Sequence, residues 1–287
     1  MSSFENVMAS MLRLQSSMEV LGVLGARLRL VTSPSANPEV AQALDAVLRA
    51  AEVPSLESLA PEQATQMAAG IKTFFAQASD LVANAEREPG WSYTDPELLD
   101  GQGKTSMLVP QLFSSAPELK NARSFLDVGT GVGWMAIAIT RLWPEATVTG
   151  LDTYQLALDM AKRNVSQAGL EQRISLRAQD VSELDDTECY DAAWLPSFFI
   201  APDKLPQALR AVRGSLRPGG VIIVGHYEPP PIPVAQALFA LRILRDGGSQ
   251  LRSSDAAKLL VSAGYTNVHE LERTWKAPIA FTIGQKG

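Results

Sequence analysis

Apolar side chains recur at helical spacing through the first 88 residues. Between positions 4 and 28 they return every three or four residues, which places them on one face of a helix. After a proline-containing break at 33–38, further helices are predicted over 38–51 and 61–86, the latter opening on a proline that suits a first helical turn. The apolar face of the first helix suits either a hydrophobic core or an interface between two copies of the chain.

From about residue 122 the pattern changes to short apolar runs alternating with helical stretches. The runs, interpreted as seven strands, are 124–128, 147–151, 173–177, 190–195, 220–225, 266–271 and 278–284. The helical stretches are 134–142, 155–168, 203–215, 233–245 and 254–263. This alternation predicts a parallel sheet with helices on both faces. Because only 272–277 separate the last two runs, no crossover helix fits there, and these two strands are expected to pair antiparallel.

The chain is therefore expected to be an α/β protein, with a doubly wound, seven-stranded, mostly parallel sheet and an α-helical N-terminal domain. A turn-rich stretch around 88–96, which contains Trp91 and Tyr93, separates the two patterns. We place the domain boundary there, giving domains 1–95 and 96–287, with a further helix over 96–115. The N-terminal domain is expected to serve either in dimerisation or as a lid over the substrate.

Composition narrows the classes of partner. The net charge is −6, and residues 1–120 hold 8 Lys and Arg against 14 Asp and Glu. Without a basic stripe, nucleic acid is not expected as a partner. The single Cys189 excludes an internal disulfide and a cysteine-rich zinc site, and with two histidines no metal is expected. No apolar run approaches ~18 residues and no secretory leader is evident, so we expect a cytoplasmic protein without a membrane partner.

A glycine-rich turn follows the first predicted strand, in the sequence FLDVGTGVGW over residues 125–134. Such a turn lets the backbone approach a ligand closely at the carboxyl edge of a parallel sheet. A dinucleotide fingerprint would need a third glycine at position 134, which is Trp134, and no G-K-[ST] follows for a P-loop. Asp127, two residues before the first glycine, suits a cationic group better than a pyrophosphate.

Acidic residues also follow the next two strands. Asp152 ends the second strand, 23 residues after Gly129, where a carboxylate can accept both hydroxyls of a ribose. Asp180, followed by Val181, comes after the third strand, where a polar side chain can meet an adenine amino group.

Together these motifs resemble the class I S-adenosylmethionine-dependent methyltransferases, of the small-molecule type with a helical N-terminal region. LDVGTGVG resembles the first motif, Asp152 the second and Asp180 the third-strand motif, and LRPGGV over 216–221 resembles the turn before the fifth strand. The resemblance covers roughly 100–287. It implies a Rossmann-like methyltransferase fold, S-adenosylmethionine as cofactor and S-adenosylhomocysteine as product.

By this resemblance the glycine turn receives the methionine part of the cofactor, Asp152 the ribose, and Asp180 with Val181 the adenine. The implied cofactor-binding residues are Asp127, Gly129, Thr130, Gly131, Gly133, Asp152, Thr153, Asp180, Val181 and Pro196.

The segment 194–200, after the fourth strand, is expected to line the acceptor site. Enzymes that methylate amino groups of DNA bases carry [DN]-P-P-[YF] there, whereas this chain has Leu-Pro-Ser-Phe. The O-methyltransferases of secondary metabolism place a catalytic histidine about 20 residues before the P-G-G, and that position here is Phe198. His226, directly after the fifth strand, is the remaining candidate for a catalytic base. Aromatic residues expected to border the acceptor are Trp91, Tyr93, Phe198, Phe199 and Tyr227.

The favoured hypothesis is methyl transfer to the oxygen, nitrogen or carbon of a small, apolar or aromatic metabolite, in secondary metabolism. A non-methylating cyclisation or isomerisation on the same fold is the alternative. A non-catalytic partner subunit that docks through its acidic helices is a third hypothesis, and methylation of a basic protein is a variant of the first.

Overall fold

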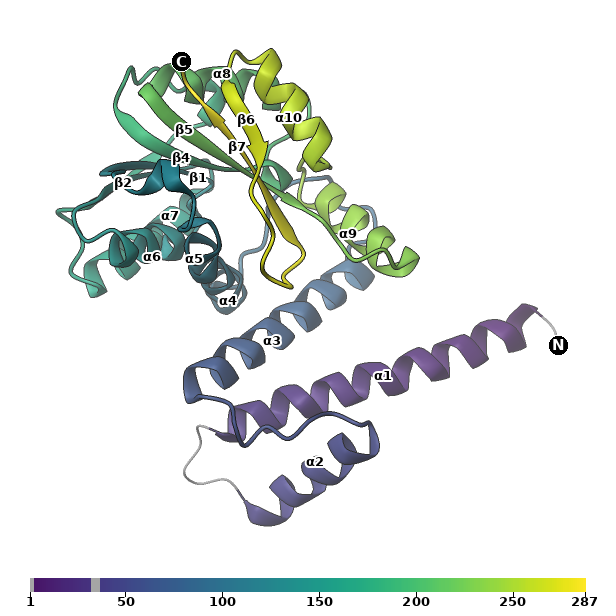
Figure 1. The fold of residues 1–287 in the computed structure, drawn as a ribbon. Helices are drawn as coiled ribbons and strands as arrows, with labels where there is room; N and C mark the ends of the chain where they lie inside the picture. The colour runs from purple at the N-terminus through teal and green to yellow at the C-terminus, as the bar shows by residue number, and fades with distance from the viewer. Residues whose placement is uncertain (1–2, 32–36) are drawn as a thin grey trace. The chain divides into compact units, whose positions relative to one another are not determined.

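The computed structural model describes residues 3–31 and 37–287, and its contacts divide the chain into two compact units between Ala85 and Glu86 (Figure 1). Residues 86–95 therefore group with the second unit. The predicted break at 33–38 lies, apart from its last two residues, outside the described part of the chain. No helix in the described ranges is both long enough and apolar enough to cross a membrane.

The first unit consists of α1 (Ser3–Val31), α2 (Pro38–Ala50) and α3 (Pro61–Ala83). α1 packs against both other helices, and its buried Leu28 lies in a cluster with Ala64 and Ala68 of α3. Gly25, which weakens the helix pattern in the sequence, has a packing role: an added Cβ would lie 2.9 Å from Ile71 of α3. The N-terminal half of α1 leaves large apolar side chains exposed, namely Phe4, Val7, Met11, Leu12, Leu14 and Met18. Dimerisation through these helices stays a prediction.

The second unit contains a seven-stranded sheet in the order β3-β2-β1-β4-β5-β7-β6. The strands are β1 (Ser124–Val128), β2 (Thr147–Asp152), β3 (Ile174–Ala178), β4 (Tyr190–Pro196), β5 (Leu216–Tyr227), β6 (Thr266–Glu270) and β7 (Ile279–Gln285). β7 runs antiparallel to both of its neighbours, and the other pairs are parallel. The predicted sheet and its terminal antiparallel strand are confirmed.

Helices cover both faces of this sheet (Figure 1). They are α4 (Pro96–Thr105), α5 (Val109–Phe113), α6 (Trp134–Leu142), α7 (Gln155–Gln167), α8 (Leu205–Ser215), α9 (Pro233–Arg245) and α10 (Ser253–Ser262). One buried cluster joins the sheet to α5, α6 and α9 and includes Phe113 and Phe281. The other joins it to α8 and α10 and includes Leu195 and Leu209.

Two elements differ from the sequence prediction by more than three residues, and several others differ by one to three residues at their ends. The single helix expected over 96–115 is interrupted by a 3-10 turn at Ser106–Leu108, because Pro110 has no N–H to continue the helix and its ring would clash with the carbonyl four residues earlier. β5 begins at Leu216 rather than at 220, because the P-G-G residues belong to the strand itself. The pairing with β4 shifts register at this point, between Tyr190 and Ala192.

Candidate functional site

A cavity of about 860 Å³ opens in the second unit at the carboxyl ends of β1, β2 and β4. β1 and β4 are neighbours in the sheet, and the chain winds outward from them in opposite directions. An open α/β sheet has a crevice at such a switch point, because the helices that connect the strands there lie on opposite faces of the sheet. The cavity's volume is near the upper end of the ~300–1,000 Å³ usual for ligand sites.

The glycine turn after β1 forms one wall of this cavity. Gly131 has a φ of +54°, which favours glycine, and a Cβ built there would face open space, with its nearest neighbour 4.0 Å away. Gly133 serves packing instead, since its Cβ would lie 3.2 Å from Ala161 of α7. Gly129, Thr130 and Gly131 line the cavity, whereas Gly133 does not.

Trp134, which replaces the third glycine of a dinucleotide fingerprint, ties this turn to α4. Its indole N–H donates to Asp100 at 2.7 Å. α4 approaches closely because Gly103 has no side chain: an added Cβ would lie 2.2 Å from Val132. α4 thus brings Gln102, and the following 3-10 turn brings Ser106, to the cavity wall.

Asp152, at the end of β2, holds the glycine turn in place. Its Oδ2 accepts the Gly131 N–H at 2.7 Å and its Oδ1 accepts the Tyr154 N–H at 2.8 Å. Burial raises the pKa of this carboxyl, and the backbone hydrogen bonds partly offset that effect. Each carboxylate oxygen can accept a second hydrogen bond, so Asp152 retains capacity for two ligand hydroxyls. Thr153 and Tyr154 line the cavity beside it.

Asp127 lies beneath the same turn and does not itself line the cavity. Its Oδ2 accepts the Thr130 hydroxyl at 2.7 Å, whereas its Oδ1 is buried without a partner among the described residues. Burial raises the pKa of Asp127 to about 7, against the lowering effect of the Thr130 bond, and the nearby Asp152 raises it further. An unsatisfied buried carboxylate is costly, and a cation at this end of the cavity would relieve that cost.

Asp180, after β3, lies at the edge of the cavity with Val181. Its Oδ1 accepts both the backbone N–H and the hydroxyl of Ser182, and its Oδ2 is 2.6 Å from the Lys204 ammonium. Although partial burial acts to raise the pKa of Asp180, these hydrogen bonds hold it below its usual value. Lys204, which the sequence analysis did not identify, also lines the cavity.

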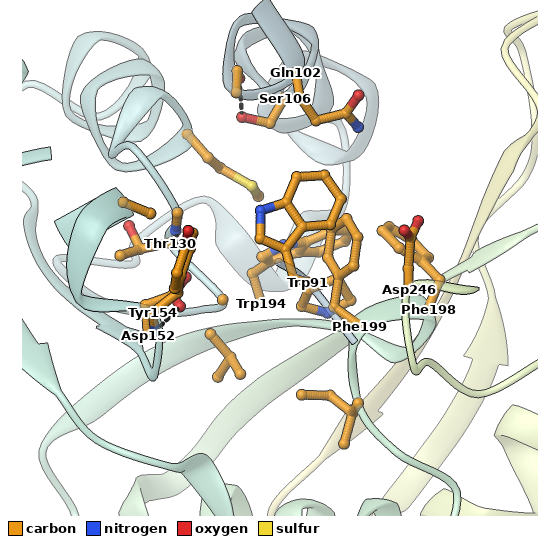
Figure 2. A pocket seen from close by; sticks show the side chains of 18 of the residues that line it. Trp91, Gln102, Ser106, Thr130, Asp152, Tyr154, Trp194, Phe198, Phe199 and Asp246 are labelled. Atoms are coloured by element: carbon orange, nitrogen blue, oxygen red, sulfur yellow. Dashed lines mark hydrogen bonds between the residues drawn. The ribbon is translucent and has the colours of Figure 1, made fainter. Parts of the chain in front are cut away.

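Aromatic rings form the part of the wall remote from Asp152 (Figure 2). Phe198 stacks on Tyr227 at 4.3 Å between centroids and meets Phe199 edge-on at 4.9 Å. Trp91 packs edge-on against Phe199 at 5.5 Å. Pro196 and these four aromatic residues line the cavity, and their binding of cofactor or acceptor stays a prediction. Tyr93 does not: its ring supports Trp91, and its carbonyl accepts the Tyr154 hydroxyl at 2.9 Å.

The expected placement of His226 needs correction. Its side chain is fully buried, its Nε2 lies 3.1 Å from the Thr282 hydroxyl of β7, and it does not line the cavity. Successive side chains of a strand point to opposite faces, so Tyr227 at the cavity directs its neighbour His226 to the other face of β5. Burial also lowers the pKa of this imidazole. The structure therefore gives no support to His226 as the catalytic base.

Several cavity residues were missed by the sequence analysis, including Gln102, Tyr154, Lys204 and Asp246. Tyr154 could have been predicted from the sequence, because it follows Asp152 by two positions at the end of a predicted strand. Asp246 belongs to no motif that the sequence shows, and only the packing of α9 against the sheet brings it to the cavity.

The comparisons with known proteins agree with this geometry. Residues 125–220 match a family described as "Methyltransferase domain". Among curated proteins, methyltransferase GfsG of Streptomyces halstedii is 34% identical over 140 residues, 47% of each chain. A release factor glutamine methyltransferase of Rhodopirellula baltica is 31% identical over 140 residues, which are 47% of this chain and 43% of the relative. The matched segments thus cover less than half the length of these relatives.

Solved structures share the fold over nearly the full length of both chains. The S-adenosylmethionine-dependent methyltransferase SibL has a TM-score of 0.68 at 20% identity, covering 96% of this chain and 98% of its own. The mitomycin 7-O-methyltransferase MmcR has a TM-score of 0.68 at 17% identity, covering 99% and 98%. PigF, solved with S-adenosylhomocysteine, has a TM-score of 0.69 at 18% identity over 100% of both chains. The predicted fold and the resemblance to class I S-adenosylmethionine-dependent methyltransferases are confirmed.

Proposed function

We propose that this chain, whose residues 125–220 match a family described as "Methyltransferase domain", transfers a methyl group from S-adenosylmethionine to a small aromatic molecule. One observation carries the proposal: a single cavity joins a glycine turn with its ribose-competent carboxylate to a wall of aromatic rings. The name of MmcR, an O-methyltransferase of a small molecule, favours oxygen as the atom methylated.

The residues at the β1–β2 end fit the cofactor. The open space above Gly131 admits the methionine part, Asp152 has free acceptor capacity for the ribose hydroxyls, and Val181 with the Asp180–Lys204 pair offers a surface for the adenine. The buried carboxyl of Asp127 and the partly buried carboxyl of Asp152 make this end favourable for a cation. Bound there, the cofactor would supply an electrophilic methyl group on a positively charged sulfur.

The aromatic wall fits the acceptor. Trp91, Phe198 and Phe199 present ring faces and edges against which a flat apolar molecule can pack. Methyl transfer depends chiefly on aligning the acceptor atom with the methyl group and excluding water, and rigid packed rings serve both purposes.

The function is tested by cofactor binding and product formation. The protein is expected to bind S-adenosylhomocysteine in calorimetry with a dissociation constant in the ~1 μM–1 mM range of ordinary enzyme ligands. With S-adenosylmethionine and a panel of hydroxylated aromatic compounds, it is expected to release S-adenosylhomocysteine and a methylated product. Absence of binding by the folded protein would contradict the function, and turnover of an acceptor without S-adenosylhomocysteine release would favour the non-methylating alternative.

Asp127 gives the cofactor site an expected pH dependence. Since its pKa is raised to about 7, the carboxyl is mostly protonated at pH 6 and mostly charged at pH 8. A ligand that carries an ammonium group favours the charged form, so affinity for S-adenosylhomocysteine should rise by up to about 10-fold between these pH values. Calorimetry across this range checks the rise. In Asp127→Asn, which stays neutral, the rise should be absent, and equal pH profiles for the two proteins would refute this role of Asp127.

A further inference from the structure

Asp246 directly follows α9, at a junction of three segments that line the cavity. Its own N–H closes α9 by donating to the Arg242 carbonyl at 2.9 Å. The next residues are attached to the turn after β4: the Ser249 N–H donates to the Ser197 carbonyl at 2.9 Å, and the Ser249 hydroxyl to the Ile200 carbonyl at 2.7 Å. The backbone around Asp246 is thus held against the segment that carries Phe198 and Phe199.

Two glycines after Asp246 allow the segments at this junction to pack closely against one another. A Cβ at Gly248 would lie 1.8 Å from the Phe198 carbonyl oxygen, so no side chain fits there. Gly247, with a φ of +75°, packs against Gly90, whose N–H donates to the Arg245 carbonyl at 2.9 Å. The segment that carries Trp91 is therefore fixed to the same point, and Asp246 is held in one position relative to the aromatic wall.

The Asp246 side chain lines the cavity on the side away from Asp152, with aromatic rings between the two carboxylates (Figure 2). It makes no hydrogen bond or ion pair with another described residue, although it is only partly exposed. A cavity carboxylate that makes no hydrogen bond within the protein has its acceptor positions open to a ligand, and such groups are characteristic of functional sites.

Charged and titratable groups face Asp246 from each neighbouring element. Burial raises the pKa of Asp246 to about 6, while the positive charges of Arg87, Arg242 and Arg245 act to lower it. The Tyr227 phenol of β5 is the remaining titratable neighbour, and burial raises its pKa to about 12, so it stays protonated. Because three arginines lie near, the site disfavours a cationic amine as acceptor and suits a neutral hydroxyl.

Resting on the proposed function, we propose that Asp246 is the base on the acceptor side: it accepts a hydrogen bond from a hydroxyl of a flat aromatic acceptor and takes that proton. The other carboxylates that line the cavity among the described residues, Asp152 and Asp180, already accept hydrogen bonds at the cofactor end. Gln102 cannot ionise. Asp246 therefore occupies the role that the absent histidine at position 198 leaves open.

The proton and electron balance is simple. The O–H bond of the acceptor breaks, the proton moves to an Asp246 carboxylate oxygen, and the electron pair stays on the acceptor oxygen. That pair forms the new O–C bond to the methyl carbon, while sulfur keeps the pair of the C–S bond that breaks. Asp246 then returns its proton to water.

The inference is tested with two probes that share a ring system, 2-naphthol and 2-methoxynaphthalene. Only 2-naphthol has a hydroxyl proton to donate. Binding is measured with saturating S-adenosylhomocysteine at pH 8. The wild-type protein should bind 2-naphthol about 10-fold or more tightly than its methyl ether, the difference made by one hydrogen bond to a charged group. The preference should decline as pH falls through about 6, because the Asp246 carboxyl is then protonated.

Asp246→Asn should abolish the preference and its pH dependence while leaving S-adenosylhomocysteine affinity within about 2-fold of wild type. The matched control is Asp185→Asn, which alters an exposed aspartate outside the cavity and should preserve both. With any hydroxylated acceptor that the wild type turns over, Asp246→Asn should lower turnover by ~10²-fold or more.

The outcomes separate this inference from the function it rests on. Failure of the wild type to bind S-adenosylhomocysteine overturns the proposed function and this inference with it. Intact cofactor binding overturns the inference alone if the wild type shows no preference for 2-naphthol, if neither probe binds, or if the preference survives in Asp246→Asn. The pH titration of the wild type needs no variant, so the test holds even if the substitution prevents folding.

Discussion

Gly131→Val is expected to abolish S-adenosylhomocysteine binding at concentrations that saturate the wild-type protein. Gly131 combines a φ of +54°, a cavity-facing position and a backbone N–H that donates to Asp152 at 2.7 Å. A valine there would be strained, because its backbone would have to adopt the left-handed region. Its branched side chain would also project into the space that the methionine part of the cofactor needs. Calorimetry on the folded variant measures the loss.

Gly214→Val provides the matched control for this substitution. Gly214 lies on α8, its φ is not positive, and an added Cβ would meet no atom within 4 Å. The control should bind S-adenosylhomocysteine as the wild type does. If Gly131→Val kept wild-type affinity with an unchanged circular dichroism spectrum, the cofactor would have to bind elsewhere than over this turn.

Asp152→Ala should weaken S-adenosylhomocysteine binding by ~1.5–3 kcal/mol, the range for hydrogen bonds to a charged group. This corresponds to a rise of roughly 10- to 150-fold in the dissociation constant. The physical reason is that both ribose hydroxyls lose their charged acceptor, and the Gly131 and Tyr154 N–H groups lose the bonds that shape the turn. Calorimetry at constant pH gives the change directly.

Two further variants define what the Asp152 result means. Asp159→Ala, on the solvent side of α7 and outside the cavity, controls for the loss of a negative charge. Asp152→Asn keeps an oxygen acceptor but removes the charge, so its affinity should fall between wild type and Asp152→Ala. Unchanged affinity in a folded Asp152→Ala protein is incompatible with a ribose bound to this carboxylate.

Local signals were sufficient for most elements of the α/β unit. β1 at 124–128 and the helices at 134–142 and 233–245 have the predicted bounds, because apolar periodicity there coincides with strong turn and cap signals at both ends. The interruption of the 96–115 helix was also encoded, by Pro110, but the apolar pattern on both sides concealed it. The meeting of Gly131, Asp152 and Asp180 in one cavity followed from the sequence as well, since the carboxyl ends of adjacent parallel strands must meet.

The sequence by itself determined the order of strands and helices, the glycine turn and the acidic residues at the ends of β1, β2 and β3. These are local features: each depends on a few neighbouring residues and on the two-residue or 3.6-residue repeat of one element. The tertiary structure alone decided where His226 and Asp246 lie relative to the cavity. Strand alternation turned His226 away from the cavity, and the close packing of Gly247 and Gly248 brought Asp246 to it from α9, about 50 residues beyond Phe198 in the chain. Contacts between segments so distant leave no periodic signal in the sequence, and that is why the place of Asp246 could be described only from the folded chain.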